Sequence, residues 1–144
     1  MTNHMKVEFE AKEGNVALAR VIAAAFLMHL DPTLDEAEDV KVAVSEAVTN
    51  AIVHGYDGRD GIVYMEAFCY DNMVMFSVKD TGKGIEDVKK AREPLFTSKP
   101  QDERSGLGFT VMESFMDSVH IDSKPNCGTT VTMTKRVGSP VNVR

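Results

Sequence analysis

The sequence predicts an α+β sandwich in which three helices pack on one face of a mixed, mostly antiparallel sheet. Strand-like segments occur in two pairs, each joined by a short turn, and such hairpins pair antiparallel. Two long segments with helical spacing of apolar residues follow the first strand, and a shorter one precedes the second hairpin. Hairpins combined with separate helices are typical of a sheet that helices cover on one side.

The N-terminal segment is expected to form a short strand followed by an apolar helix. Residues 6–11 alternate between apolar and polar side chains, which predicts a strand with one solvated face. Asn15 can cap a helix that runs to about Leu30, where an Asp-Pro pair ends it. This helix is apolar nearly all round, with Arg20 as the exception. We therefore expect it to be covered on more than one side, by the sheet and by a second subunit or a partner.

The second helix carries the clearest signals at both ends. Thr33 as N-cap and Glu36 three residues later form a capping box. Apolar residues then recur at three- and four-residue spacing as far as His54. Gly55 suits the left-handed position that follows many helices, so we expect the helix to end there.

The remainder of the chain is expected to hold the two hairpins, a long connection and the third helix. A single domain over residues 1–137 is predicted, with a frayed tail at 138–144. Residues 86–105 are rich in charge and contain two prolines, and so long a connection in a small domain is usually functional or mobile. The third helix is expected at 109–116. The hairpins are expected at residues 62–69 with 73–80, and at 119–123 with 129–136.

Composition excludes several classes of protein. With 43% hydrophobic and 26% charged residues, the chain of 144 residues is typical of one globular domain. A formal charge of -6 argues against nucleic acid as a direct partner. Neither a membrane-spanning segment nor a signal peptide is expected. The two cysteines lack metal-ligand spacing, which favours a reducing, cytoplasmic location.

Three polar residues of the second helix are candidates for chemistry. Glu46, Asn50 and His54 are spaced by four residues and therefore share a face of the helix. The amide oxygen of Asn50 can bind Mg²⁺, which prefers oxygen ligands. The carboxylate of Glu46 can accept a proton from a nucleophile. A solvated polar stripe is the alternative, and His54 is expected to pack at or cap the helix end.

Glycine-rich segments supply two further candidates. Asp80 ends a strand and is followed by Gly82 and Gly84, so its carboxylate could accept a hydrogen bond from an exocyclic amine such as that of adenine. Residues 105–109 lead into a helix, where backbone amides can bind phosphate, and Arg104 could reach a terminal phosphate. An ordinary turn and a flexible linker are the alternatives for these two segments.

Together these segments resemble the motifs of the GHKL superfamily of ATPases and kinases. Residues 46–51, with the His-Gly pair after them, resemble its N box, and 80–84 resemble its first glycine box. Residues 106–108 resemble the second glycine box, and 128–130 resemble the closing motif. Four motifs in this order are specific as a set. The resemblance implies a Bergerat fold that binds ATP and Mg²⁺, with an ATP lid at about 86–105.

Within that superfamily, the chain looks similar to the anti-sigma F factors of spore-forming bacteria, which are serine protein kinases. Residues 45–56, 94–100 and 103–109 carry this resemblance, which covers roughly residues 5–136. It implies a homodimer that binds and inhibits a sporulation sigma factor of the sigma F type. It also implies an anti-anti-sigma factor as the protein substrate, phosphorylated on a serine.

The resemblance assigns roles to individual residues. Asn50 would ligate Mg²⁺, Asp80 would hold adenine, and Glu46 would activate the substrate serine. Arg104 would face the γ-phosphate, and Arg20 would contact a protein partner. The rest of the nucleotide site would consist of Gly82, Gly84, Thr97, Ser105, Gly106, Leu107, Gly108, Phe109 and Thr130.

Two other functions are compatible with the same motifs. One is an ATP-dependent binding module that sequesters a sigma factor without kinase turnover. The other is a general-stress anti-sigma kinase of the same family. Glu46 favours a kinase over a binding module, because binding alone does not need a carboxylate beside the Mg²⁺ ligand.

Overall fold

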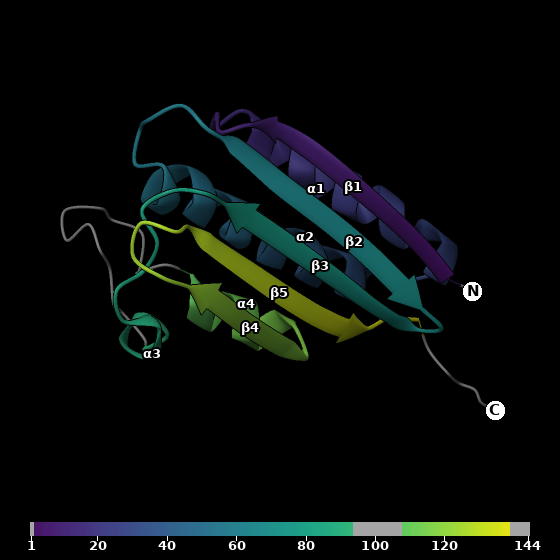
Figure 1. The fold of residues 1–144 in the computed structure, drawn as a ribbon. Helices are drawn as coiled ribbons and strands as arrows, with labels where there is room; N and C mark the ends of the chain where they lie inside the picture. Colours follow the sequence, from purple (N-terminus) through teal and green to yellow (C-terminus); the bar gives the residue numbers. More distant parts are fainter. Residues whose placement is uncertain (1, 94–107, 139–144) are drawn as a thin grey trace.

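The computed structural model describes residues 2–93 and 108–138, and Figure 1 shows the arrangement of these residues. They form a five-stranded sheet in the order β1-β2-β3-β5-β4. All of its pairings are antiparallel. The strands are β1 (Thr2–Glu10), β2 (Ile62–Tyr70), β3 (Met73–Asp80), β4 (Ser118–Ser123) and β5 (Thr129–Arg136).

The main helices cover one face of this sheet, as the sequence predicts (Figure 1). Helix α2 lies between α1 and α4, and it also contacts β3. None of the helices in the described residues is long and apolar enough to cross a bilayer. The helical elements are α1 (Asn15–Leu27), η1 (Met28–Leu30), α2 (Leu34–Thr49), η2 (Asn50–Gly55), α3 (Val88–Ala91) and α4 (Phe109–Phe115).

The core lies between the sheet and α2. Side chains alternate along the strands, so every second residue faces the helices. The buried face of α2 carries small and β-branched side chains, which allow the helix to lie close to the strands. The core side chains include Val40, Ala43, Val44, Ala47 and Val48 of α2, and Val63, Met65, Val74, Phe76, Val78, Val131 and Met133 of the strands.

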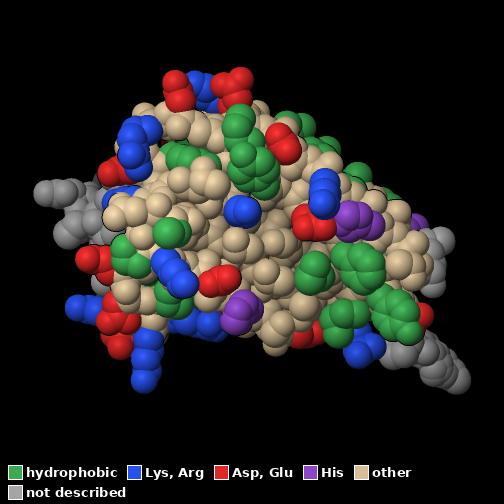
Figure 2. All heavy atoms as spheres, viewed as in Figure 1, with side chains coloured by type: hydrophobic (Ala, Val, Ile, Leu, Met, Phe, Trp, Pro, Cys, Tyr) green, Lys and Arg blue, Asp and Glu red, His purple; other side chains and the backbone are tan. Residues whose placement is uncertain are grey.

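The other face of the sheet is open in the described residues (Figure 2). Phe68 and Tyr70 lie on this face at the end of β2 and are 37% and 61% exposed. The ring of His4 on β1 packs edge-on against Phe68. Strand β1 begins at Thr2, four residues earlier than expected, because its polar first residues pair with β2.

The first helix differs from the prediction at both ends. Asn15 is not its cap: it is the first residue of α1, and its Nδ2 donates a hydrogen bond to the carbonyl of Glu10 at 2.8 Å. The α-helix ends at Leu27, and η1 carries the chain on to Asp31, which adopts a left-handed φ of 55°. Leu18, which the structure leaves 45% exposed, belongs to an outer face that the described residues do not cover.

The second helix begins as predicted and ends differently. Thr33 accepts a hydrogen bond from the amide of Glu36 at 3.0 Å, and the Thr33 amide donates to the Glu36 side chain at 2.9 Å. From Asn50 onward the helix widens into the π-helix η2, a feature that is frequent at functional sites. Gly55 is not left-handed; the chain turns instead at Asp57 and Gly58, where φ is 51° and 84°.

Candidate functional site

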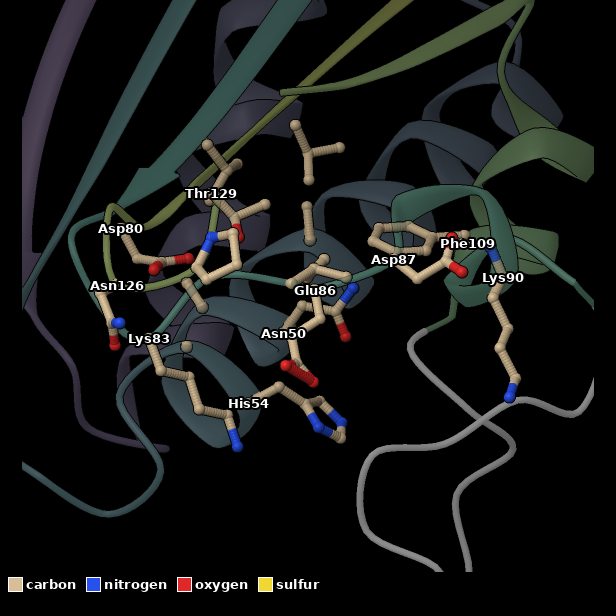
Figure 3. A pocket seen from close by; sticks show the side chains of 18 residues that line it. Asn50, His54, Asp80, Lys83, Glu86, Asp87, Lys90, Phe109, Asn126 and Thr129 are labelled. Atoms are coloured by element: carbon tan, nitrogen blue, oxygen red, sulfur yellow. Dashed lines mark hydrogen bonds between the residues drawn. The ribbon is translucent and has the colours of Figure 1, made fainter. Parts of the chain in front are cut away.

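A cavity of about 620 Å³ lies where the predicted motifs meet (Figure 3). Its walls come from the end of α2, from η2, from the turn after β3, from the start of α4 and from the turn between β4 and β5. Asn50, Asp80, Gly84 and Phe109 all line it, although they are distant in the sequence. The fold therefore brings the candidate motifs together around one space.

Asp80 is the buried acid of this cavity. It is the last residue of β3, and its side chain is only 4% exposed. Oδ1 accepts a hydrogen bond from the amide of Gly82 at 2.9 Å. Burial raises the pKa of Asp80 to about 6, against the opposing effect of the Gly82 and Thr129 amides. A carboxylate has several acceptor positions, so Asp80 can also take a hydrogen bond from a ligand.

The turn after Asp80 is held by close backbone packing. A Cβ at Gly82 would lie 2.0 Å from the carbonyl oxygen of Gly55. Gly84 has a φ of 74°, and a Cβ there would lie 1.9 Å from the carbonyl oxygen of Lys124. The two glycines predicted to shape the adenine pocket thus allow this wall of the cavity to form.

Asn50 opens η2 and lines the same cavity. Its Nδ2 is buried and has no hydrogen-bond partner among the described residues. An unsatisfied buried donor costs about 1–3 kcal/mol, so an acceptor supplied by a ligand at this position would stabilise the site. An amide offers such a donor to a phosphate oxygen and offers its own oxygen to a cation, so Asn50 fits a Mg²⁺-bound phosphate. The described residues hold no cluster of three or more acidic, histidine or cysteine side chains that could bind a metal by themselves.

Glu46 lies beside the cavity, next to the start of α4. It precedes Asn50 by about one helical turn, and its neighbour Ala47 lines the cavity. Gly108, just before α4, has a φ of 74°, and a Cβ there would lie 2.1 Å from Oε1 of Glu46. A glycine at this position therefore makes room for the carboxylate. His54 is buried and also lines the cavity.

Other candidates lie at or beyond the edges of this site. Thr129 is buried and lines the cavity, whereas Thr130 is the next residue along β5, where side chains alternate between faces. Arg20 is exposed on α1 and is not part of the cavity wall. The remaining candidates lie outside the described residues: Thr97, Arg104, Ser105, Gly106 and Leu107.

The cavity also contains charged and polar side chains that the sequence patterns did not single out. Lys83 stands between the two glycines of the turn and pairs with Asp57, the Nζ and Oδ2 atoms being 3.7 Å apart. Asp87 caps the short helix α3 by accepting a hydrogen bond from the amide of Lys90 at 3.0 Å. Asp87 comes from the charged segment at 86–105, so only the general charge of that segment could have indicated it, whereas Lys83 lies within the motif at 80–84 without a role assigned to it. Figure 3 shows their placement around the cavity.

Comparison with known proteins agrees with this geometry. A family model described as "Histidine kinase-like ATPase domain" matches residues 9–135. The chain is 51% identical over 138 residues to an anti-sigma F factor of Bacillus subtilis (strain 168), covering 95% of this chain and 94% of the relative. It is 55% identical over 133 residues to an anti-sigma F factor of Clostridium kluyveri, covering 92% and 94%.

Solved structures support the fold. The RsbU and RsbW domains of Rv1364c from Mycobacterium tuberculosis match with a TM-score of 0.68 and 22% identity, over 96% of this chain and 33% of that one. The catalytic domain of the histidine kinase ThkA matches with a TM-score of 0.60 and 15% identity, over 94% and 99%. With a family model over most of its length and relatives at half identity, the chain belongs to the histidine kinase-like ATPase family and, within it, to the anti-sigma F factors.

Proposed function

We propose that this protein is an anti-sigma factor and an ATP-dependent protein-serine kinase. It binds and inhibits a sporulation sigma factor of the sigma F type, and it inactivates an anti-anti-sigma factor by phosphorylating a serine. The observation that carries this proposal is one cavity that joins a buried acid, Asp80, to an unsatisfied amide, Asn50, with the carboxylate of Glu46 beside it. The sigma factor is proposed from the names of the relatives, and the anti-anti-sigma factor from the family resemblance of the sequence motifs. We place these reactions in the cytoplasm.

ATP fits the cavity by size and by chemistry. A volume of about 620 Å³ lies in the usual range for small-molecule sites. The carboxylate of Asp80 would accept a hydrogen bond from the exocyclic amine of adenine. Guanine carries an oxygen at that position, which would repel a carboxylate. The phosphates would extend toward Asn50 and the start of α4, where the resemblance assigns backbone contacts to residues 105–109.

The amide oxygen of Asn50 would hold Mg²⁺, whose other ligands would be phosphate oxygens and water. The cation would neutralise charge on the phosphates during transfer. The orphaned Nδ2 of Asn50 supports this assignment, because a phosphate oxygen would satisfy it.

Phosphoryl transfer then requires a proton acceptor beside the nucleotide. The hydroxyl oxygen of the substrate serine would form a bond to the γ-phosphorus while its proton passes to the carboxylate of Glu46. The bond from the γ-phosphorus to the bridging oxygen would break, and ADP would leave with that oxygen. Arg104 would face the γ-phosphate and stabilise its charge.

Incubation with labelled ATP, Mg²⁺ and candidate anti-anti-sigma factors tests this proposal. We expect transfer of the γ-phosphate to one serine, which mass spectrometry would locate. Binding of ATP and a sigma factor without transfer to any candidate would instead support the binding-module alternative. Absence of ATP binding would contradict both functions.

We also propose that the protein is a homodimer that associates through its N-terminal region. Strand β1 is an edge strand of the described sheet, and Phe68 is partly exposed beside it on β2. Leu18 and Val21 on α1 are 45% and 66% exposed, so this helix presents more than one apolar side chain to solvent. Light scattering at micromolar concentration is expected to give twice the mass of the chain. A monomer under these conditions would contradict the dimer.

Arg20→Glu is expected to weaken binding of a protein partner without unfolding the domain. Arg20 is exposed, and after Lys41 it contributes to lowering the pKa of Glu38 on the neighbouring helix, so its charge acts on this surface. A reversed surface charge usually changes stability little. Binding to sigma and anti-anti-sigma factors can be measured by calorimetry, with Lys89→Glu as an exposed control on α3, which Figure 1 shows apart from α1. Equal affinity in Arg20→Glu and wild type would rule out a partner contact at Arg20.

A further inference from the structure

The end of η2 is pressed against the side chain of Asp80. A Cβ at Gly55 would lie 2.7 Å from both Cγ and Oδ1 of Asp80, and 2.8 Å from Oδ2. The backbone of Gly55 is not left-handed, so a larger residue could adopt its conformation. The position requires glycine because the carboxylate occupies the space that a side chain would fill.

The carbonyl of Gly55 makes a second contact with the same turn. It accepts a hydrogen bond from the amide of Lys83 at 2.9 Å, and it approaches Gly82 so closely that Gly82 also has no room for a Cβ. Gly55 therefore contacts the turn at Asp80 and again two to three residues later.

Tyr56 holds the residue that follows Asp80. Its ring is buried, and its hydroxyl donates to the carbonyl of Ile62 at 2.6 Å. The same hydroxyl accepts a hydrogen bond from the amide of Thr81 at 2.9 Å and lies 3.2 Å from Oγ1 of Thr81. The hydroxyl of Tyr56 thus links the start of β2 to the turn that follows Asp80.

We propose that Gly55 and Tyr56 are positioning residues that fix the orientation of the Asp80 carboxylate and thereby set the selectivity of the cavity for a base with an exocyclic amine. This inference rests on the proposed nucleotide function. Figure 3 shows the Asp80 carboxylate directed into the cavity. A methyl group at Gly55 would have to displace all three atoms of that carboxylate, and its hydrogen bond from Gly82 would be disturbed with them.

The selectivity of the cavity between two nucleotides tells whether Gly55 and Tyr56 position the Asp80 carboxylate or only stabilise the fold. Inosine nucleotides differ from adenine nucleotides at the exocyclic position, where an oxygen replaces the amine. A general loss of structure would weaken Mg-ADP and Mg-IDP alike. Displacement of the carboxylate would weaken Mg-ADP selectively, so the ratio of the two affinities is the informative quantity.

The experiment measures both nucleotides by calorimetry for wild type, Gly55→Ala and Tyr56→Phe. Wild type is expected to prefer Mg-ADP by at least about tenfold, the usual scale for a hydrogen bond to a charged group. Gly55→Ala should bring the ratio close to one, and Tyr56→Phe should lower it by a smaller factor. Tyr56→Phe also tests the inference if Gly55→Ala does not fold.

Two controls match these changes. A Cβ at Gly14 would meet no atom of the described chain within 4 Å, so Gly14→Ala should keep the wild-type ratio. Tyr70 is 61% exposed, so Tyr70→Phe should do the same. In an Asp80→Ala background, Gly55→Ala should have no further effect on the ratio, because the carboxylate that it displaces is gone.

The results distinguish a failure of the positioning role of Gly55 and Tyr56 from a failure of the proposed nucleotide-binding function. If wild type prefers Mg-ADP and both site variants keep that preference, the positioning role is wrong while the nucleotide site stands. If wild type binds neither nucleotide, the proposed function itself fails.

Discussion

Glu46→Gln is expected to lower the rate of phosphate transfer to the anti-anti-sigma factor by about 10²–10⁴-fold, the usual contribution of a general base. Glutamine keeps the size and hydrogen bonding of the side chain, but it cannot take the serine proton at neutral pH. The position supports this result, because the Glu46 carboxylate lies against Gly108 beside the cavity that Asn50 lines. Binding of Mg-ATP and of the sigma factor should survive, since neither step needs a proton acceptor.

The matched control for this variant is Glu38→Gln. Glu38 lies two turns earlier on α2, is exposed, and pairs with Lys41. Because Glu38 lies near Arg20, the comparison uses a saturating concentration of the anti-anti-sigma factor, where Glu38→Gln should transfer phosphate at the wild-type rate. Single-turnover measurements at saturating ATP would separate the transfer step from nucleotide binding. A Glu46→Gln rate equal to wild type would show that another group removes the proton.

The strands could be predicted from the sequence because each carries its own local signal. Strand β3 and strand β5 begin and end at the predicted residues, since alternating apolar side chains end at turn residues on both sides. Strand β1 was predicted too short. Its first three residues are polar, and only their pairing with residues 68–70 of β2 places them in the sheet.

Helix ends were harder to predict, because their geometry depends on distant contacts. Asn15 has the side chain of a cap, but it bonds to Glu10 in the preceding strand instead. Gly55 has the residue type of a left-handed helix end, yet its role is to pack against Asp80, which lies on another element. A residue type alone could not separate these two roles of glycine.

The sequence predicted which residue types form the candidate site more fully than it predicted which of these residues contact one another. Asn50 and Asp80 were identified by motif, and the fold places both on one cavity. The closeness of Glu46 to Gly108 could not be deduced, because it joins α2 to α4 across more than sixty intervening residues. The same limit applies to Thr129, since the motif did not indicate which of two threonines would face inward.

Asp80→Asn is expected to weaken adenine nucleotides by about 1.5–3 kcal/mol, because the acceptor of a charged hydrogen bond is replaced by a group that can donate. The pH dependence should confirm the cause. With a pKa of about 6, Asp80 is protonated at lower pH and loses the negative charge that strengthens its hydrogen bond from the amine, so affinity should rise as pH increases through 6. At pH 5 the wild type should bind about tenfold more weakly than its limit at high pH.

The nucleotide's own phosphate also titrates near pH 6, so Asp80→Asn measured in the same buffers supplies the baseline. The free energy of unfolding of Asp80→Asn gives an independent test of the raised pKa of Asp80. Burial raises the pKa of Asp80 from 3.8 to about 6, so this group favours folding fully below pH 3.8, and that contribution is lost as pH rises through 6. Urea denaturation without nucleotide should therefore show Asp80→Asn more stable than wild type at pH 7, with the difference disappearing near pH 4. A variant that binds adenine poorly yet folds more stably would identify Asp80 as a residue kept for recognition; unchanged affinity at pH 7 would exclude that role.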